Sequence, residues 1–188
     1  MPEERVRSFI AFDVDNENVL RRLADVQREL TDTGADLELV KPQNVHVTLR
    51  FLGEISSTMM DRVYEEMSGV KIKPFDIELR GMGAFPNLRR PRVVWIGIKK
   101  GASELIDIFD QLEPRLNGLG FTPEKRGFSP HITVARVRTG KCKEELAQRI
   151  VERSDYDFGV VKANSLKLKK SVLTPKGPVY SVLREVKP

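Results

Sequence analysis

Both histidines of this chain begin the same four-residue pattern, which reads His46-Val47-Thr48-Leu49 in the first half and His131-Ile132-Thr133-Val134 in the second. Histidine has an ordinary pKa of about 6.5, so it gives or takes a proton near neutral pH. Alternation in a strand puts the imidazole and the hydroxyl of each pattern on one face, opposite the apolar side chains. Two such strands at one cleft would provide an acid, a base and two hydroxyl donors, a set suited to opening a phosphodiester.

The two patterns lie 85 positions apart, from 46 to 131, and other features repeat at the same offset. An apolar strand predicted at 7–12 falls on another at 92–97, and one amphipathic helix falls on a second. The apolar stripes of these helices are Leu20, Leu23, Val26 and Leu30, and Leu105, Ile108, Phe109, Leu112 and Leu116. Gly34 and Gly118 follow them, where a left-handed residue commonly ends a helix. The shared register indicates an internal duplication.

Each half therefore reads as a strand, a helix, a short strand or loop, the patterned strand and a second helix, at 58–67 or 143–152. Further strands are predicted at 75–79, 165–169 and 179–183, the last two joined by a turn at 174–178. We predict an α+β fold, a single domain over 1–188 built from two pseudo-symmetric lobes. The lobes are placed at about 5–70 and 90–155, with further strands at 73–85 and 156–186. Each lobe is expected to be an antiparallel-rich sheet with helices packed outside, and the active-site groove to lie between the lobes.

The composition is that of a globular protein, with 40% hydrophobic and 31% charged residues. The net charge of +5 favours a polyanionic partner such as RNA. The sequence shows no signal peptide and no apolar run near the roughly 20 residues of a membrane span, so no membrane partner is expected. A single cysteine, Cys142, cannot form an internal disulfide, which predicts a cytoplasmic location.

Other catalytic chemistries fit the sequence less well. Two histidines would need further ligands to hold zinc, and the chain has no third histidine and no cysteine pair, so we predict neither a metal nor another cofactor. The chain also lacks the Gly-x-Ser-x-Gly pattern of serine hydrolases and the Gly-x-x-x-x-Gly-Lys pattern of ATPases.

Three arginines and one phenylalanine near the patterns are candidate substrate contacts. Arg50 has the same parity as His46, so a straight strand directs it to the cleft, whereas Arg136 faces the cleft only if a β-bulge intervenes. Arg126 lies in the loop before the second pattern, and Phe128 beside it could stack on a base. Solvated arginines and a core phenylalanine are an equally good interpretation of these residues.

The sequence resembles the two-histidine (2H) phosphoesterase superfamily, and within it the RNA 2′,3′-cyclic phosphodiesterases, also called 2′-5′ RNA ligases. The resemblance extends over nearly the whole chain. It is carried by Arg7-Ser8-Phe9-Ile10-Ala11-Phe12, by His46-Val47-Thr48-Leu49-Arg50-Phe51-Leu52-Gly53-Glu54 and by Phe128-Ser129-Pro130-His131-Ile132-Thr133-Val134-Ala135-Arg136.

This resemblance implies metal-independent hydrolysis of a terminal 2′,3′-cyclic phosphate on RNA to a 2′-phosphate. It implies that His46 is the proton donor and His131 the proton acceptor, while Thr48 and Thr133 hold the nonbridging oxygens. Two such similar patterns could exchange the donor and acceptor roles, so the sequence alone leaves that assignment open. The expected partner is RNA with a cyclic phosphate end, tRNA fragments among them, and the expected assembly is a monomer.

Related activities stay open at this point. Reverse 2′-5′ ligation to a 5′-hydroxyl is expected as a minor activity, because water competes with the second RNA end. The alternatives are a hydrolase of small cyclic nucleotides or 2′-5′ oligonucleotides, and a module that binds RNA ends without catalysis.

Overall fold

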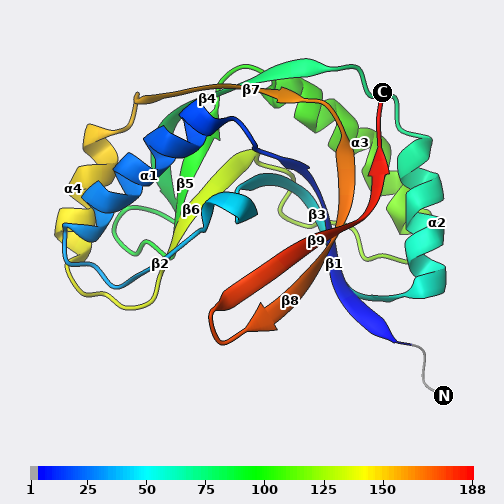
Figure 1. Ribbon diagram of the computed structural model, residues 1–188, viewed down its shortest axis with the longest axis horizontal. Coiled ribbons are helices and arrows are strands. Elements are labelled where there is room, and N and C mark those ends of the chain that lie inside the picture. The colour runs from blue at the N-terminus through cyan, green and yellow to red at the C-terminus, as the bar shows by residue number, and fades with distance from the viewer. Residues whose placement is uncertain (1–3) are drawn as a thin grey trace.

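Residues 4–188, which the computed structural model describes, form one curved antiparallel sheet with helices along its outer side (Figure 1). Nine strands are present in this part of the chain, in the order β7-β4-β5-β6-β3-β1-β8-β9, with β2 paired to β6. The strands are β1 (Arg5–Asp13), β2 (Leu37–Leu39), β3 (His46–Ser56), β4 (Phe75–Phe85), β5 (Val93–Ile98), β6 (His131–Val137), β7 (Asp157–Ala163), β8 (Leu166–Thr174) and β9 (Gly177–Val186). The helices are α1 (Glu17–Thr31), α2 (Ser57–Ser68), α3 (Ala102–Gly118) and α4 (Lys143–Glu152). The predicted two-lobed α+β architecture is confirmed.

The sheet divides at the junction of β3 and β6 into two halves. The β3 half contains β3, β1, β8 and β9, and α2 and α3 pack together against it. The β6 half contains β6, β5, β4, β7 and β2, and α1 and α4 pack together against it. Figure 1 shows the two helix pairs at opposite ends of the arch, with the β8–β9 hairpin projecting between them.

The two halves do not coincide with continuous chain segments, which differs from the lobes expected at 5–70 and 90–155. Helix α1 follows β1 along the chain but packs on the β6 half, and α3 follows β5 but packs on the β3 half. Strand β4 follows β3 and α2 along the chain but pairs with β5 of the β6 half. Strand β8 follows β7 along the chain but pairs with β1 of the β3 half. An amphipathic helix buries its apolar stripe equally well on either half, so the repeat fixes the elements but not the half that each one covers.

Local sequence explains where the first helix begins and where the first and third helices end. The side chain of Asn16 caps α1 by accepting from the backbone N–H groups of Asn18 and Val19, at 3.0 and 3.1 Å. Gly34 has the expected left-handed conformation after α1, with φ of 80°. Gly118 does not, because it is the last helical residue of α3, and Gly120 takes the left-handed position with φ of 97°.

The apolar stripes predicted from periodicity point into the core. Leu23, Val26 and Leu30 of α1 are buried, as are all five predicted positions of α3. None of the helices within residues 4–188 has the length and apolar character needed to cross a membrane.

Candidate active site

The two patterned strands meet at a single residue pair, Val47 and Ile132, which the internal repeat relates to each other. Both side chains are fully buried, so the residues on either side of them face the opposite side of the sheet. Antiparallel pairing at this point sets His46 across from Thr133, and Thr48 across from His131. The two histidines are therefore diagonal neighbours, a relation that separates residues by roughly 7–8 Å. A phosphate group fits between side chains at that separation.

Both imidazoles are oriented by a hydrogen bond to the carbonyl oxygen of the residue two positions earlier. The Nδ1–H of His46 donates to the carbonyl oxygen of Asn44 at 2.6 Å, and that of His131 donates to the carbonyl oxygen of Ser129 at 2.7 Å. Because a carbonyl oxygen only accepts, Nδ1 carries the proton in each ring and Nε2 is left to exchange one with a ligand. Each pattern thus presents Nε2 as its reactive atom.

His46 lies in a tightly packed environment. Its ring centroid is 5.0 Å from that of Phe9 and 5.4 Å from that of Tyr180. Burial lowers the pKa of His46 to about 4, and the nearby charges of Lys169 and His131 act in the same direction. The carbonyl of Asn44 and the carboxylate of Asp13 oppose that shift without reversing it. Before an anion binds, His46 is therefore neutral at pH 7.

A buried cluster of ionised side chains lies beside His46 on the inner face of the sheet. Asp13 pairs with His46 across β1 and β3, and it accepts hydrogen bonds from Lys169 and Lys167. Burial opposes ionisation of Asp13, but the two lysines outweigh it and hold the pKa of that carboxyl below its ordinary value. Lys169 also lies 5.9 Å from the centre of the Tyr180 ring. The cluster and Tyr180 together cover the β3 half of the inner face.

His131 has a simpler environment. The ring of Phe85 meets it edge-on at a centroid distance of 5.0 Å, and Gly97 is its partner on β5. Beyond β5 the sheet continues with β4 and β7, which hold the places that β8 and β9 hold on the β3 half, and Phe85 is the last residue of β4. The two half-sites thus share their backbone geometry but differ in cover.

A β-bulge interrupts each patterned strand at equivalent positions. In β3 the partners of Thr48 and Arg50 are consecutive residues of β1, which leaves Leu49 unpaired. In β6 the partners of Thr133 and Ala135 are consecutive residues of β5, which leaves Val134 unpaired. An extra residue reverses the alternation of every residue after it.

The bulges decide which predicted side chains reach the cavity. Arg136 lines it, as expected if a bulge intervened, and Phe51 lines it at the equivalent position of β3. Arg50 does not: it faces away, where its Nε donates to Glu113 at 2.9 Å and its guanidinium donates to the carbonyl of Thr122. The prediction that Arg50 points to the cleft assumed a straight strand and is wrong for that reason.

The other two candidate contacts also lie outside the cavity. Phe128 stacks on Phe109 of α3, with centroids 4.9 Å apart and planes 17° apart, so it packs against the core. Arg126 is exposed in its loop and does not line the cavity. For both residues the structure agrees with the alternative interpretation given above.

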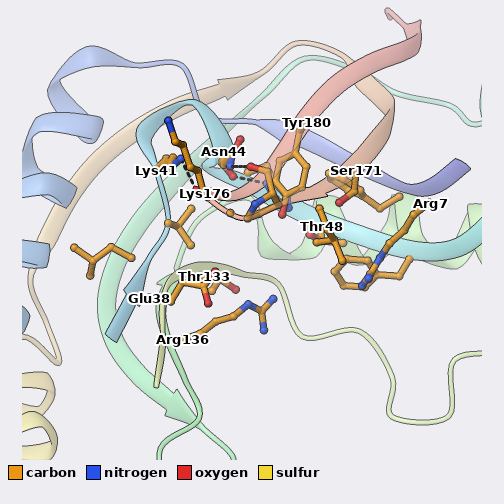
Figure 2. Close-up of a pocket in the computed structure, with 18 of the residues that line it drawn as sticks. Arg7, Glu38, Lys41, Asn44, Thr48, Thr133, Arg136, Ser171, Lys176 and Tyr180 are labelled. Carbon is orange, nitrogen blue, oxygen red and sulfur yellow. Dashed lines mark hydrogen bonds between the residues drawn. The ribbon is translucent and has the colours of Figure 1, made fainter. Parts of the chain in front are cut away.

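A cavity of about 620 Å³ lies over the seam and is lined by both halves. His46, Thr48, His131, Thr133 and Arg136 share it. Figure 2 shows Thr133 and Arg136 on one side of this space, with Thr48, Tyr180 and Lys176 on the other. The lining residues that sequence reasoning missed include Arg7, Lys41, Lys176, Phe9, Phe51 and Tyr180. Cations and aromatic rings around two histidines can bind an anion that carries a flat base.

The β8–β9 hairpin is fastened to the loop before His46. The side-chain amide of Asn44, which is buried, donates to the carbonyl of Pro178 at 2.8 Å. Lys41 donates to the carbonyl of Lys176 at 2.7 Å. Asn44 therefore holds His46 through its backbone and the covering hairpin through its side chain, a link invisible to sequence reasoning because 134 positions separate the partners.

The chemistry available to this site is proton transfer and anion binding. Two imidazoles that each leave Nε2 for a ligand can act on opposite sides of one phosphorus atom, and two hydroxyls can donate to its oxygens. Within residues 4–188, no group of three or more His, Cys, Asp or Glu side chains is arranged to hold a metal ion.

Comparison with protein families and curated sequences gives a consistent result. The sequence profile described as LigT-like phosphoesterase matches twice, at residues 14–95 and 96–180. An RNA 2′,3′-cyclic phosphodiesterase of Aeropyrum pernix is 42% identical over 88% of this chain and 94% of its own length. One from Archaeoglobus fulgidus is 38% identical over 95% of this chain and 98% of its own length. The double match agrees with the internal repeat.

Solved structures share the fold. A Thermus thermophilus protein aligns over 96% of this chain and 97% of its own, with a TM-score of 0.78 and 26% identity. The E. coli LigT structure in complex with 3′-AMP aligns over 98% of each chain, with a TM-score of 0.77 and 21% identity.

Proposed function

The chain belongs to the LigT-like phosphoesterase family, and on that premise we propose that its cavity hydrolyses 2′,3′-cyclic phosphate ends of RNA to 2′-phosphates with two histidines as acid and base. The observation that carries the proposal is the seam at Val47 and Ile132, which sets each histidine across from the threonine of the other pattern. Curated relatives at 42% and 38% identity over most of the chain are named RNA 2′,3′-cyclic phosphodiesterases, which supports the substrate class.

The proposed reaction is one in-line displacement at phosphorus. Nε2 of His131 takes a proton from a water molecule, whose oxygen forms a new bond to phosphorus. The bond from phosphorus to the ribose 3′-oxygen breaks, and Nε2–H of His46 gives its proton to that oxygen. The products are a 2′-phosphate and a free 3′-hydroxyl, and the two imidazoles recover their protonation through solvent. Thr48 and Thr133 donate to the nonbridging oxygens during this step.

The lowered pKa of His46 sets a condition on this assignment. At a pKa of about 4 the ring is neutral at pH 7 before the anion binds, so it cannot donate until it gains a proton. Binding of the anionic phosphodiester should raise the pKa of His46, because a negative charge beside an imidazole favours its protonated form. We expect proton uptake when the anion binds, and a bell-shaped dependence of kcat/KM whose acidic limb falls near pH 4.

A bridging-sulfur substrate tests the donor role directly. Purified protein is incubated with chelator and an oligonucleotide that ends in a 2′,3′-cyclic phosphate, and the ring opening is followed by phosphorus NMR. A matched substrate carries sulfur in place of the 3′-oxygen, since a thiolate leaves without protonation. His46→Ala should lose activity on the oxygen substrate and regain most of it on the sulfur substrate, whereas His131→Ala should lose both.

Each remaining outcome of this experiment counts against a stated part of the proposal. Rescue of His131→Ala alone would exchange the two roles. Binding of the cyclic end without turnover by the wild type would overturn the proposed function in favour of an RNA-end-binding module. Loss of wild-type activity in chelator would overturn the metal-independent reaction.

We expect a minor ligation activity from the same site. A 5′-hydroxyl in the position of the attacking water would form a 2′-5′ linkage, with His131 and His46 in unchanged roles. Water is present at far higher concentration, so hydrolysis should dominate. The substrates we propose are cytoplasmic RNA ends such as tRNA fragments, processed by a monomer.

A further inference from the structure

We propose that the β6 half carries a second nucleotide-binding subsite, formed by Trp95, Gly83 and Arg89, for the RNA residue on the 5′ side of the cyclic-phosphate nucleotide. We call this surface the Trp95 shelf. The inference rests on the proposed function, because it extends the substrate from a terminal nucleotide to a polynucleotide chain. Its central element is the single tryptophan of the sequence.

Trp95 lies on the catalytic face of the sheet, next to the site. On β5 it pairs with Thr133 of β6 on one side and with Gly83 of β4 on the other. Its neighbours Val94 and Ile96 are buried and point to the opposite face, toward the helices. Adjacent strands are about 4.8 Å apart, so the shelf begins one strand away from the threonine proposed to hold the phosphate.

The indole ring of Trp95 packs against the backbone of β4 at Gly83. A Cβ atom added to Gly83 would lie 2.2 Å from the indole, so only glycine leaves room for the ring there. The indole Nε1 is buried without a hydrogen-bond partner among residues 4–188, and the ring contacts Gly83 and Phe85, whose ring centroid is 5.3 Å away. A flat aromatic ring seated on a strand is a stacking platform for a base.

Arg89 lines the same surface hollow as Trp95, and two further arginines lie on its loop. The β4–β5 loop carries Arg89, Arg90 and Arg92, all exposed and without an ion-pair partner among residues 4–188. The loop is ordered by Asn87, whose side-chain oxygen accepts from the backbone N–H groups of Arg89 and Arg90 at 3.0 and 3.1 Å. Unpaired guanidinium groups on an ordered loop suit phosphate recognition.

Trp95, Gly83 and Arg89 all line one surface hollow. It lies on the β6 half, beside the catalytic cavity. It is about 640 Å³ in volume and is lined by Gly83, Ala84, Asn87, Leu88, Arg89 and Trp95. Phe85 contacts both Trp95 and His131, and Arg136 lines the catalytic cavity beside Val93, the first residue of β5. A chain that leaves the catalytic phosphate toward the β6 half passes Thr133 and Arg136 before it reaches the shelf.

The β3 half has no room for an equivalent subsite. Its corresponding face is filled by Asp13, Lys167 and Lys169 and is covered by Tyr180 of the hairpin. The shelf therefore has no counterpart at the equivalent positions of the β3 half. A stacking ring followed by cations selects a nucleotide over a protein segment, because it matches a base and the phosphate that follows it.

A length series tests the shelf kinetically. The substrates are a mononucleoside 2′,3′-cyclic phosphate and a dinucleotide with the same terminal cyclic phosphate. The wild type should prefer the dinucleotide in kcat/KM, by about ten-fold or more. Trp95→Ala should abolish most of that preference, because one base stack is worth about 5- to 150-fold, and Trp95→Phe should keep most of it. Arg89→Ala should lower the dependence of log(kcat/KM) for the dinucleotide on log[salt] by about 0.7.

Intrinsic fluorescence gives a readout that needs no turnover. Because Trp95 is the only tryptophan, quenching reports a base at the shelf. The dinucleotide should quench the His131→Ala protein at lower concentration than the mononucleotide does. Arg62→Ala, an exposed arginine of α2 on the β3 half, is the matched control and should leave both the quenching and the salt dependence unchanged.

The outcomes separate this inference from the proposed function. Equal kcat/KM of the wild type on both substrates, or no quenching by the dinucleotide, would overturn the shelf. An equal loss on both substrates in Trp95→Ala and Trp95→Phe would make Trp95 a structural residue only. If the wild type turned over neither substrate, the proposed function would fail while quenching still decided the shelf.

Discussion

His46 and His131 are held alike, each by a carbonyl two residues earlier, but one lies beneath a hairpin and the other beside an open surface. The β3 half covers its inner face with Tyr180 and an ion cluster, whereas on the β6 half Trp95 packs on Gly83 and lines a surface hollow. The duplication has therefore kept the backbone geometry that orients the imidazoles. The two copies differ in the side chains that cover each histidine.

Because of this difference, we expect the two half-sites to have separate roles in the proposed reaction. The covered half provides a desolvated imidazole, whose pKa burial lowers to about 4. The open half provides access for the substrate chain. In the proposed reaction, the pairing of the strands at Val47 and Ile132 brings both half-sites to one phosphorus atom. The following variants compare equivalent residues of the two halves.

Removing either imidazole should have the largest effect. We expect His46→Ala and His131→Ala each to lower kcat by about 10²–10⁴-fold, the usual contribution of a general acid or base. The double variant should be only slightly worse than either single one, because acid and base act in the same step. Single-turnover rates measure these losses. A variant with near wild-type kcat would show that the two half-sites are not partners in catalysis.

Stability should respond to pH through His46 in particular. The unfolded chain binds a proton at His46 below about pH 6.5, but the folded chain does so only below about pH 4. The free energy of unfolding should therefore fall as pH falls through this window, by up to about 3 kcal/mol from this residue.

Asparagine substitutions isolate that contribution. His46→Asn keeps a donor for the carbonyl of Asn44 and should flatten the pH dependence between 4 and 6.5 in urea titrations. His131→Asn serves as the matched comparison. If the two variants flattened the curve equally, the difference in cover would have no electrostatic consequence.

The threonines should contribute less than the histidines, and equally. A hydrogen bond to a charged group is worth about 1.5–3 kcal/mol, so Thr48→Val and Thr133→Val should each lower kcat by roughly 10- to 150-fold. Thr→Ser at either position should restore most of the rate. A large effect at one threonine only would place the phosphate in one half-site instead of between the two.

The smallest effect should come from the hairpin fastening. Asn44→Ala removes the hydrogen bond to Pro178, worth about 1 kcal/mol, and loosens the cover over His46. The acidic limb of kcat/KM should then move upward from about pH 4 toward 6.5. Ser129→Ala, at the equivalent position before His131, has an exposed side chain and should change neither stability nor the limb. If the two variants behaved identically, the hairpin would have no influence on the pKa of His46.

Periodicity predicted the helices and strands well, because apolar stripes report directly on burial. The helix at 143–152 has the predicted bounds, and the turn between β8 and β9 lies where proline and glycine indicated. The repeat also pointed to the facing histidines, since equivalent residues in a two-fold arrangement meet at the axis.

Other parts of the site left no readable signal. A bulge adds one residue without any change in composition, so Arg50 was expected in the cavity while Phe51 was overlooked. The repeat offset could have found Phe51, because it falls on Arg136, the residue already seen to need a bulge. Tyr180 and Lys176 reach the site through tertiary packing of a hairpin whose own sequence only indicates strands.

The hairpin that closes over His46 also has a bearing on synthesis. Domains are made from the N-terminus onward, and both histidines emerge before residues 166–186, which form β8 and β9. A nascent chain thus carries both reactive rings before Lys167, Lys169 and Tyr180 exist to shield the first of them. Full competence on RNA should therefore be acquired only after residues 166–186 have left the ribosome and folded.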